Sequence, residues 1–330
     1  MKKIINHPEN AVKEMLEGFA AAYPDSVEYL ADHAVIKRKH LRKGKVAIIS
    51  GGGSGHEPAH AGYVGEGMLD AAVAGEVFTS PAPDQILAAM KAVNTGAGVL
   101  LIIKNYSGDV MNFDMAAELA EMDGIPVETV IVNDDVAVED SLFTTGRRGI
   151  AGTVFIHKIA GALAEKGASL SEIKQVCERA IERVRSMGMA LSPCVIPTSG
   201  KPSFTIGETE MELGMGIHGE PGLEREPLQS AANIAEALAE AVLHEEIFQT
   251  GDELAVMING LGATPMMELY IVNRTVQQLL KDKGFQVIKI FIGEYMTSLE
   301  MSGCSLTLFQ VDEQLKELLL APSDAPAFKC

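Results

Sequence analysis

The chain has 330 residues and a net charge of −18, from 45 acidic and 27 basic side chains, and 47% of its residues are apolar. This composition excludes a disordered or fibrous chain, and the length predicts about two domains. The acidic balance argues against binding to nucleic acids or anionic membranes, because their phosphate groups require clustered Lys and Arg.

The N-terminal residues Met1–Asn10 contain no long apolar run and no small-residue cleavage site, so we expect no signal peptide. No stretch approaches the roughly 20 apolar residues that a membrane-spanning helix requires. The cysteines follow no spacing typical of zinc or redox motifs, which predicts reduced thiols in a cytoplasmic protein. These cysteines are Cys177, Cys194, Cys304 and Cys330.

Three short apolar runs in the N-terminal half predict strands that are buried on both faces: Lys45–Ser50, Val99–Lys104 and Val127–Val132. Helical spacing of apolar residues marks Asp84–Val93 and Phe113–Met122. This alternation of strands and helices is typical of an open α/β sheet.

Two further helices are predicted around the middle of the chain. Gly152–Lys166 is apolar throughout and predicts a buried helix. Ser169 and Glu172 form a capping box, and a stripe of apolar residues from Ile173 to Val184 follows at helical spacing.

Prolines interrupt Met187–Phe204, so we place a domain boundary there. The predicted domains are 1–186, with the glycine-rich segment and Asp109, and 187–330, with the His218 loop. The second half repeats the alternation, which predicts two α/β domains, each a sheet covered by helices. Its expected elements are helices at Leu228–His244 and Met266–Leu280 and strands at Leu254–Asn259, Val287–Ile292 and Ser305–Val311.

The segment Gly-Gly-Gly-Ser-Gly-His-Glu-Pro-Ala-His at 51–60 follows the first predicted strand directly. Glycine lets the backbone approach a ligand and expose its N–H groups. The segment is neither a P-loop nor a dinucleotide fingerprint. A tight turn would need fewer glycines, so a ligand-binding loop is the favoured interpretation.

His56, Glu57 and His60 also match the zinc-protease pattern His-Glu-x-x-His. That chemistry requires both histidines on one face of an uninterrupted helix, and Pro58 breaks that premise. Pro58 fits better as the first residue of a helix, which leaves His56 on the loop. His60, one helical turn later, lines or supports the same pocket.

Lys-Asn-Tyr-Ser-Gly-Asp at 104–109 lies at the carboxyl end of another predicted strand, where open α/β sheets bind ligands. Lys104 is suited to hold a ligand oxygen, and Asp109 to accept from a hydroxyl. The alternatives are a solvated strand end for Lys104 and a helix N-cap for Asp109. The residues alone do not decide between them.

His218 lies between glycines in Gly-Ile-His-Gly-Glu-Pro-Gly at 216–222 and could reach a ligand, but its spacing alone favours a turn histidine without a role. His157, in an apolar helical stretch, is predicted to be a satisfied core residue. The segment 259–265 is predicted to be a Thr cap with Pro at the first helical position rather than a second anion site. Arg147 and Arg148 are expected in a solvated loop.

Taken together, these segments resemble the K subunits of phosphotransferase-dependent dihydroxyacetone kinases. The resemblance covers nearly the whole chain, and its long motifs are specific. The matching motifs are the segments 51–60, 75–81, 104–109, 146–153, 216–222 and 259–265.

The resemblance implies a two-domain α/β homodimer that binds dihydroxyacetone. It implies that His218 adds to the ketone carbon to give a hemiaminal, that His56 is the general base for the hydroxyl to be phosphorylated, and that Asp109 binds substrate hydroxyls. Lys104 and the loop of Gly53, Ser54, Gly55 and His56 complete the implied pocket. An imidazole with a pKa near 6.5 suits both histidine roles.

The sequence contains no P-loop, kinase signature or convincing magnesium-ligand cluster, and the chain stops at Cys330. We therefore expect no cofactor or metal on this chain. The resemblance implies an L subunit that carries ADP and magnesium and an M subunit that recharges the ADP. Two alternatives stay open: a ligand sensor that acts with a transcription regulator, and a kinase subunit for another short ketose such as erythrulose.

Overall fold

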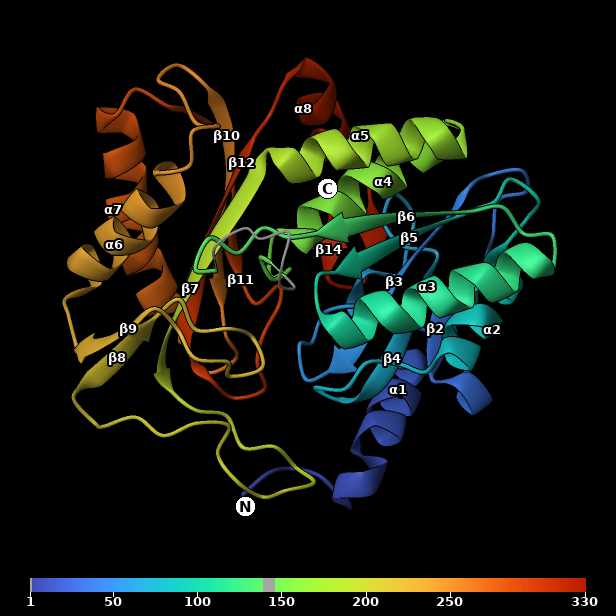
Figure 1. Ribbon diagram of the computed structural model, residues 1–330, viewed down its shortest axis with the longest axis horizontal. Helices are drawn as coiled ribbons and strands as arrows, with labels where there is room; N and C mark the ends of the chain where they lie inside the picture. Colours follow the sequence, from blue (N-terminus) through green and yellow to red (C-terminus); the bar gives the residue numbers. More distant parts are fainter. Residues whose placement is uncertain (1, 139–145) are drawn as a thin grey trace.

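The computed structural model describes residues 2–138 and 146–330 and contains two six-stranded sheets with helices on both sides of each (Figure 1). Helices α4 and α5 pack between the sheets, α2 and α3 cover the outer face of the first sheet, and α6 and α7 cover the outer face of the second. Among the described residues, no helix combines the length and apolarity needed to span a bilayer.

The first sheet has the strand order β1-β2-β4-β3-β5-β6. Strands β4, β3, β5 and β6 are parallel to one another. Strand β2 pairs antiparallel with β4, and β1 pairs antiparallel with β2 at the edge of the sheet. The strands are β1 (Val27–Leu30), β2 (Val35–Arg38), β3 (Ala47–Ser54), β4 (Ala71–Val77), β5 (Val99–Lys104) and β6 (Val127–Val132). The helices of this part are α1 (Ala11–Ala22), α2 (Pro83–Val93), α3 (Ser107–Met122), α4 (Thr153–Glu165) and α5 (Leu170–Glu182), with 3-10 turns at Pro8–Asn10, Ala31–His33 and Ala61–Tyr63.

The second sheet has the order β11-β10-β12-β7-β8-β9, and only its β10–β11 pair is parallel. Its strands are β7 (Val184–Ser192), β8 (Glu210–Leu213), β9 (Glu224–Pro227), β10 (Glu253–Gly260), β11 (Gln286–Gly293) and β12 (Ser302–Gln310). Its helices are α6 (Ala231–Leu243), α7 (Met266–Asp282) and α8 (Glu313–Leu320), and a small hairpin of β13 (Asp324–Ala325) and β14 (Phe328–Lys329) ends the chain.

Helix α4 is the centre of the largest core, which explains its apolar sequence. All twelve residues from Thr153 to Ala164 are buried. The Phe155 ring stacks on Phe309 of the second sheet, with centroids 5.3 Å apart, while other residues of α4 pack on β3 and β5. A helix covered on both sides has no polar face, because each side meets apolar neighbours. Complete burial of a side chain such as Phe155 stabilises the fold by roughly 1.5–3 kcal/mol.

The predicted α/β class is confirmed, and β5 and β6 have the predicted bounds. The predicted cap at Ser169 is confirmed, because its hydroxyl accepts from the Glu172 N–H. Helix α3 begins six residues before the predicted start at Phe113. Its N-cap residue, Tyr106, makes no side-chain cap, so the sequence carries no start signal.

The region of the predicted domain boundary is only partly irregular. Strand β7 continues to Ser192 inside the second sheet, and the prolines follow it. Near the other end of the chain, the Asp324 N–H donates to the Glu66 carbonyl and the Ala327 N–H to the Gly62 carbonyl, so the C-terminal tail packs on the first half. The division into 1–186 and 187–330 stays a prediction.

Candidate functional site

The glycine-rich segment is mostly strand rather than loop, which corrects the sequence-based expectation. Strand β3 continues through Gly53 to Ser54 and pairs with β4. A Cβ at Gly53 would lie 2.5 Å from the Thr79 backbone nitrogen, closer than real Cβ atoms approach. Glycine is therefore required because the chain after β4 crosses directly over this strand.

The segment after Ser54 turns without forming the helix that Pro58 was predicted to begin; only a 3-10 turn follows, at Ala61–Tyr63. His56 and His60 therefore do not share a helix face, which removes the structural basis of a zinc-protease site. The Ser54 hydroxyl donates to the Gly75 carbonyl at 2.7 Å, and the Gly55 N–H donates to the Glu57 carboxylate at 3.1 Å. These bonds hold the loop itself.

His56 is completely buried and fixed on two sides. Its Nδ1 lies 2.7 Å from the Thr297 carbonyl oxygen, and its ring stacks on Phe78 with centroids 5.2 Å apart. Burial, the charge of Lys104 and the nearby His218 hold the pKa of His56 well below its usual value. His56 is therefore a neutral imidazole at neutral pH.

His218 lies on the loop between β8 and β9 and meets His56 across the two halves of the chain. The two Nε2 atoms are 3.0 Å apart. His218 Nδ1 lies 2.8 Å from the Glu220 carboxylate, and its ring packs edge-on against Tyr106, with centroids 4.6 Å apart. The structure thus brings together two histidines of which one was predicted, on spacing alone, to have no role.

Lys104 and Asp109 lie beside this pair. A Cβ at Gly52 would be 3.2 Å from Lys104 Nζ and 3.4 Å from Asp109 Oδ2. Lys104 Nζ and Asp109 Oδ1 are buried and have no hydrogen-bond partner among the described residues. Burial lowers the pKa of Lys104, although Asp109 and Glu220 oppose the shift. Such a donor and acceptor are suited to bind polar groups from outside the protein, either an ordered water or the oxygens of a ligand.

Asp109 lies in the first turn of α3 and is not the residue that caps it. The N-cap residue is Tyr106, so the alternative interpretation of Asp109 as the helix N-cap is wrong. Lys104 is fully buried, so a solvated strand end is wrong as well.

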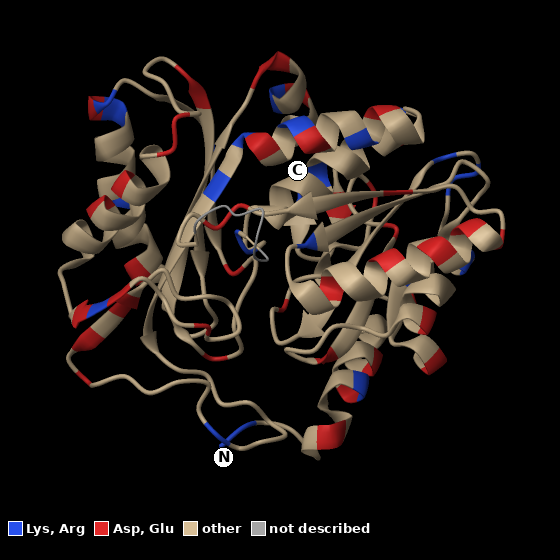
Figure 2. Cartoon of the chain, viewed as in Figure 1, with Lys and Arg blue, Asp and Glu red and all other residues tan. Residues whose placement is uncertain are grey.

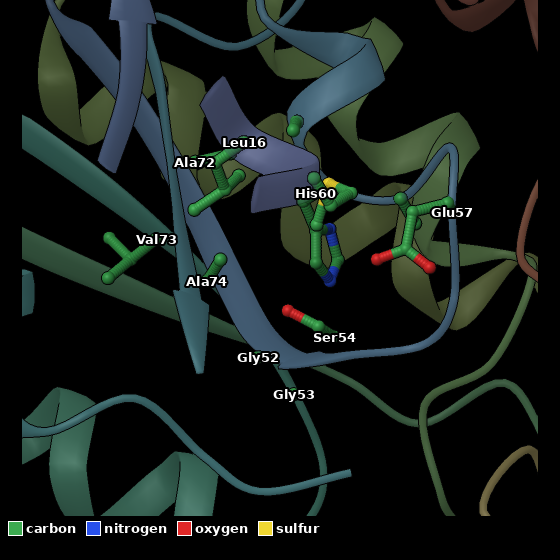
Figure 3. A pocket seen from close by; sticks show the side chains of 12 residues that line it. Leu16, Gly52, Gly53, Ser54, Glu57, His60, Ala72, Val73 and Ala74 are labelled. Atoms are coloured by element: carbon green, nitrogen blue, oxygen red, sulfur yellow. The ribbon is translucent and has the colours of Figure 1, made fainter. Parts of the chain in front are cut away.

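His60 lies on the other side of the same strand end, where it lines a small cavity of about 10 Å³ with Gly52, Gly53 and Glu57 (Figure 3). This is room for about one water molecule. His157 of α4 is buried, with its ring centroid 5.2 Å from that of His60. Both nitrogens of His157 have no partner among the described residues, so it is a core residue but not a satisfied one.

The basic pair that was expected in a solvated loop supports the site instead. Arg148 is buried and donates to Asp135 and to the Gly214 carbonyl, which precedes the His218 loop. Arg147 donates to both carboxylate oxygens of Glu245, each at 2.8 Å. Both arginines therefore tie the first half of the chain to the second.

The segment 259–265 is a support rather than a second anion site. The Asn259 side chain holds the turn at Tyr295 and Met296, directly before the carbonyl that accepts from His56. Helix α7 begins at Met266 with Pro265 at the N-cap, and the Thr264 hydroxyl bonds to Gly303. The sequence predicted Thr264 as the N-cap and Pro265 as the first helical residue. The observed N-cap is Pro265, one residue later.

Four residues that shape the site were not predicted from the sequence. Phe78 and Tyr106 lie inside motifs that were noted, and Glu220 lies two residues after His218, so their proximity was available as a signal. Thr297 carries no such signal, because it lies 241 residues from its partner His56.

The fold and the site define a two-sheet α/β protein in which paired imidazoles, a buried lysine and a buried carboxylate lie close together. The comparisons with known proteins agree with this class. The chain belongs to the Dak1 domain family, whose model matches residues 17–327.

One relative, from Listeria innocua, is 54% identical over 99% of this chain and 100% of its own length, and is named the dihydroxyacetone-binding subunit DhaK of a PTS-dependent dihydroxyacetone kinase. The solved dihydroxyacetone kinase of C. freundii is 38% identical with a TM-score of 0.93, over 99% of this chain and 60% of that one. A solved dihydroxyacetone kinase operon co-activator is 40% identical with a TM-score of 0.91, over 96% and 97%.

Proposed function

We propose that the chain is the dihydroxyacetone-binding subunit of a phosphotransferase-dependent dihydroxyacetone kinase. The observation that carries this proposal is the convergence of His56 and His218, with Nε2 atoms 3.0 Å apart, beside the unpartnered groups of Lys104 and Asp109. The 54% identity to a full-length relative of that name supports it.

In the proposed reaction, His218 Nε2 adds to the ketone carbon and forms a covalent hemiaminal. His56 then accepts the proton of the terminal hydroxyl as that oxygen attacks the phosphoryl group. Lys104 and Asp109 hold the ligand oxygens, and Gly53, Ser54 and Gly55 form the wall of the pocket. Only a carbonyl compound can be captured in this way, so glycerol is excluded by chemistry rather than by size.

The phosphoryl donor belongs to a partner. We propose an L subunit that holds ADP and magnesium and, indirectly, an M subunit that recharges the ADP, all in the cytoplasm. This chain would bind no nucleotide or metal of its own.

The outer face of α3 supports a docking place for the L subunit beside the site, because α3 begins at the site with Asp109 in its first turn. Met111, Met115 and Leu119 form an exposed apolar stripe there. Asp114, Glu118 and Glu121 lie on the same helix, and in Figure 2 the charged positions of α3 are all red, the colour of Asp and Glu. No Lys or Arg within the described ranges pairs with these three carboxylates. A partner face with apolar and basic side chains fits this surface.

A second exposed apolar surface, at the start of α7, supports the proposed homodimer. Met267 and Tyr270 are more than half exposed. Beside them, a cavity of about 240 Å³ is lined by Leu228, Ile234 and Ile271. Exposed apolar surface of this kind marks an interaction site. We expect native mass spectrometry to give twice the mass of the chain.

The deciding experiment incubates the protein with its L subunit, a phosphoryl source and dihydroxyacetone. We expect dihydroxyacetone phosphate to form only when both subunits are present. Binding of the ketose without turnover would contradict the kinase role and support the sensor role. The similarity to an operon co-activator favours the sensor as the second candidate.

Repeating the assay with erythrulose tests the other alternative, because a higher kcat/KM for erythrulose would identify a different ketose as substrate.

A further inference from the structure

Two residues beside the His56 loop have an unusual backbone conformation. Phe78 has a φ of +56° and Leu299 a φ of +53°, in the left-handed region that residues with a Cβ seldom adopt. Among the described residues, Ala34 is the one other non-glycine residue with a positive φ. Backbone strain of this kind persists only where the surrounding structure imposes it, and it gathers at functional sites. The two positions therefore indicate a feature that the site requires.

Contacts with the His56 loop impose this conformation from both sides. The Phe78 N–H donates to the Ser54 carbonyl at 3.0 Å, and the Leu299 N–H donates to the Gly55 carbonyl at 2.7 Å. A Cβ at Gly55 would lie 2.8 Å from the Phe78 ring and 3.3 Å from a Leu299 methyl group. The loop is thus packed between an aromatic and an aliphatic side chain that come from opposite halves of the chain.

The Phe78 ring covers one face of His56. The two rings are stacked, with centroids 5.2 Å apart and planes inclined by 21°. Phe78 is half-buried, whereas His56 is completely buried, so the phenyl ring lies between His56 and the surface. Phe78 also packs on a small core that holds it in place. This core consists of Ala190, Cys194, Met215, Leu261 and Met301.

The chemistry of the site explains why such a cover is needed. His56 is a neutral imidazole, and a neutral base accepts a proton from water as readily as from an alcohol. Water is far more abundant than any ketose, so an open site would pass the phosphoryl group to water. The reaction with the ketose requires that water be kept away from His56 Nε2.

We propose that Phe78 is a positioning residue that seals the His56 face of the site against water, so that the base serves the hydroxyl of the ketose and not a water molecule. The proposal deepens the proposed function and rests on it, because it concerns the same phosphoryl transfer. Leu299 closes the opposite side of Gly55.

The seal also acts on the charge of His56. Burial is the largest of the causes that hold the pKa of His56 below its usual value. The titratable groups around His56 and its neighbours come from segments other than the one that carries Phe78. These groups are Lys104, His218, His60, Asp109, Glu220 and Glu57. Removing the phenyl ring therefore changes the burial of His56 without removing a charge.

Without the ring, water reaches the place of the ligand hydroxyl. Its oxygen forms the bond to phosphorus, the bond from phosphorus to the ADP oxygen breaks, and the water proton moves to His56 Nε2. The products are inorganic phosphate and ADP. The nucleoside triphosphate on the proposed L subunit is then consumed without any ketose phosphate.

Phe78→Gly tests the proposal, because glycine keeps the left-handed backbone and removes only the ring. The protein is incubated with dihydroxyacetone and an L subunit loaded with ATP and magnesium, and inorganic phosphate and dihydroxyacetone phosphate are both measured. For the wild type we expect almost equal amounts of ketose phosphate formed and ATP consumed. For Phe78→Gly we expect the ratio of inorganic phosphate to ketose phosphate to rise roughly tenfold. An unchanged ratio would overturn the seal.

Nuclear magnetic resonance of the histidine rings tests the same seal in this protein alone, without an L subunit. We expect wild-type His56 to stay neutral down to about pH 5. In Phe78→Gly we expect the proton affinity of His56 to rise about tenfold, because water then solvates its charged form. A merely structural role of Phe78 would lower stability without moving this titration, so an unchanged titration would contradict the proposal.

Phe78→Leu is the rescue variant, because an apolar side chain still covers His56 and Leu299 shows that leucine fits a left-handed position beside this loop. We expect both readouts to return to wild-type values. Phe204→Ala is the matched control, since Phe204 packs on the same small core but on the side of Gly219. Its His56 should titrate as in the wild type. A change as large as that of Phe78→Gly would assign the effect to a loosened core and overturn the role of Phe78.

If Phe78→Gly does not fold, Phe78→Asn replaces it, because asparagine adopts the left-handed conformation more readily than most residues with a Cβ. The same two readouts and the same outcomes apply. A wild-type protein that forms no dihydroxyacetone phosphate would refute the proposed function. The titration of His56 would still decide whether Phe78 seals the site, so the two failures are distinguishable.

Discussion

His56 and His218 lie 162 residues apart in the sequence, and each is held by a different neighbour. The motifs around both histidines are rich in glycine because neighbouring side chains leave no room for a Cβ atom. A Cβ at Gly216 would collide with the Glu220 carboxylate, and a Cβ at Gly55 would collide with the Phe78 ring. The sequence indicates which residues carry chemistry but not that these two rings touch.

His218→Ala is expected to abolish the covalent adduct, because it removes the nucleophile. Intact mass of the protein with dihydroxyacetone measures this directly. His244→Ala, at an exposed histidine, is the control and should retain the adduct. An adduct that survives in His218→Ala would refute the nucleophile assignment.

His56→Ala is expected to retain the adduct and to slow phosphorylation by roughly 10²–10⁴-fold, the contribution typical of a positioned general base. The two readouts are intact mass and steady-state turnover with the L subunit. Turnover at the wild-type rate would remove the base role from His56.

Gly53→Ala is expected to destabilise the protein and disrupt the site, because its Cβ would meet the Phe78 and Thr79 backbone within 2.8 Å. Gly18→Ala in α1 is the matched control, since nothing lies within 4 Å of its Cβ. We expect Gly18→Ala to raise the free energy of unfolding by about 0.5–1 kcal/mol, through helix propensity. Urea denaturation compares the two, and equal stability of both variants would contradict this account of Gly53.

At the scale of elements, the short buried strands were the most predictable. Strand β5 reads Val-Leu-Leu-Ile-Ile-Lys and is buried throughout, so composition alone indicated its bounds. Helix α3 was harder, because its exposed methionines blur the amphipathic pattern and Tyr106 gives no cap signal. Two helices, α1 and α8, were missed, as were strands β1, β2, β4, β7, β8, β9, β13 and β14.

The exposed stripe of α3 leads to a prediction about the partner. Met115→Asp places a charge in the middle of the apolar stripe and is expected to raise the KM for the L subunit by about tenfold without changing adduct formation. Met122→Asp, at the far end of the helix from the site, is the control and should have little effect. Equal turnover in wild type and Met115→Asp would place the docking surface elsewhere.

The buried histidines predict how stability depends on pH. Burial lowers the pKa of His157 in α4 from about 6.5 to about 3, and the pKa values of His56 and His60 are lowered as well. Between these values the unfolded chain binds protons that the folded chain does not, so the free energy of unfolding falls as pH falls below about 6.5. Each such histidine contributes up to about 1.4 kcal/mol per pH unit.

His157→Phe tests this contribution, because it removes one buried base whose ring nitrogens have no partner among the described residues. Urea denaturation at a series of pH values should show a slope that is smaller by about 1.4 kcal/mol per pH unit. A slope equal to that of the wild type would contradict the assignment.

At the scale of the whole molecule, the sequence predicted two helix-covered sheets. It did not predict that both sheets pack on the same layer of helices, α4 and α5. The apolar stretch of α4 indicated burial without indicating that two sheets cover it, because periodicity does not report the partner of a face. The strands of the second sheet are mostly antiparallel, and the short apolar segments that predicted them did not indicate strand direction. Thr297, Asn259 and Arg148 support the site through tertiary contacts, which have no local sequence signal.

A crystal structure of the protein soaked with dihydroxyacetone tests the central claim most directly. We predict a bond from His218 Nε2 to the central carbon of the ketose, a terminal hydroxyl within hydrogen-bond distance of His56 Nε2, and Nε2 atoms further apart than 3.0 Å. A ketose bound elsewhere, with the contact between the two rings unchanged, would contradict the account.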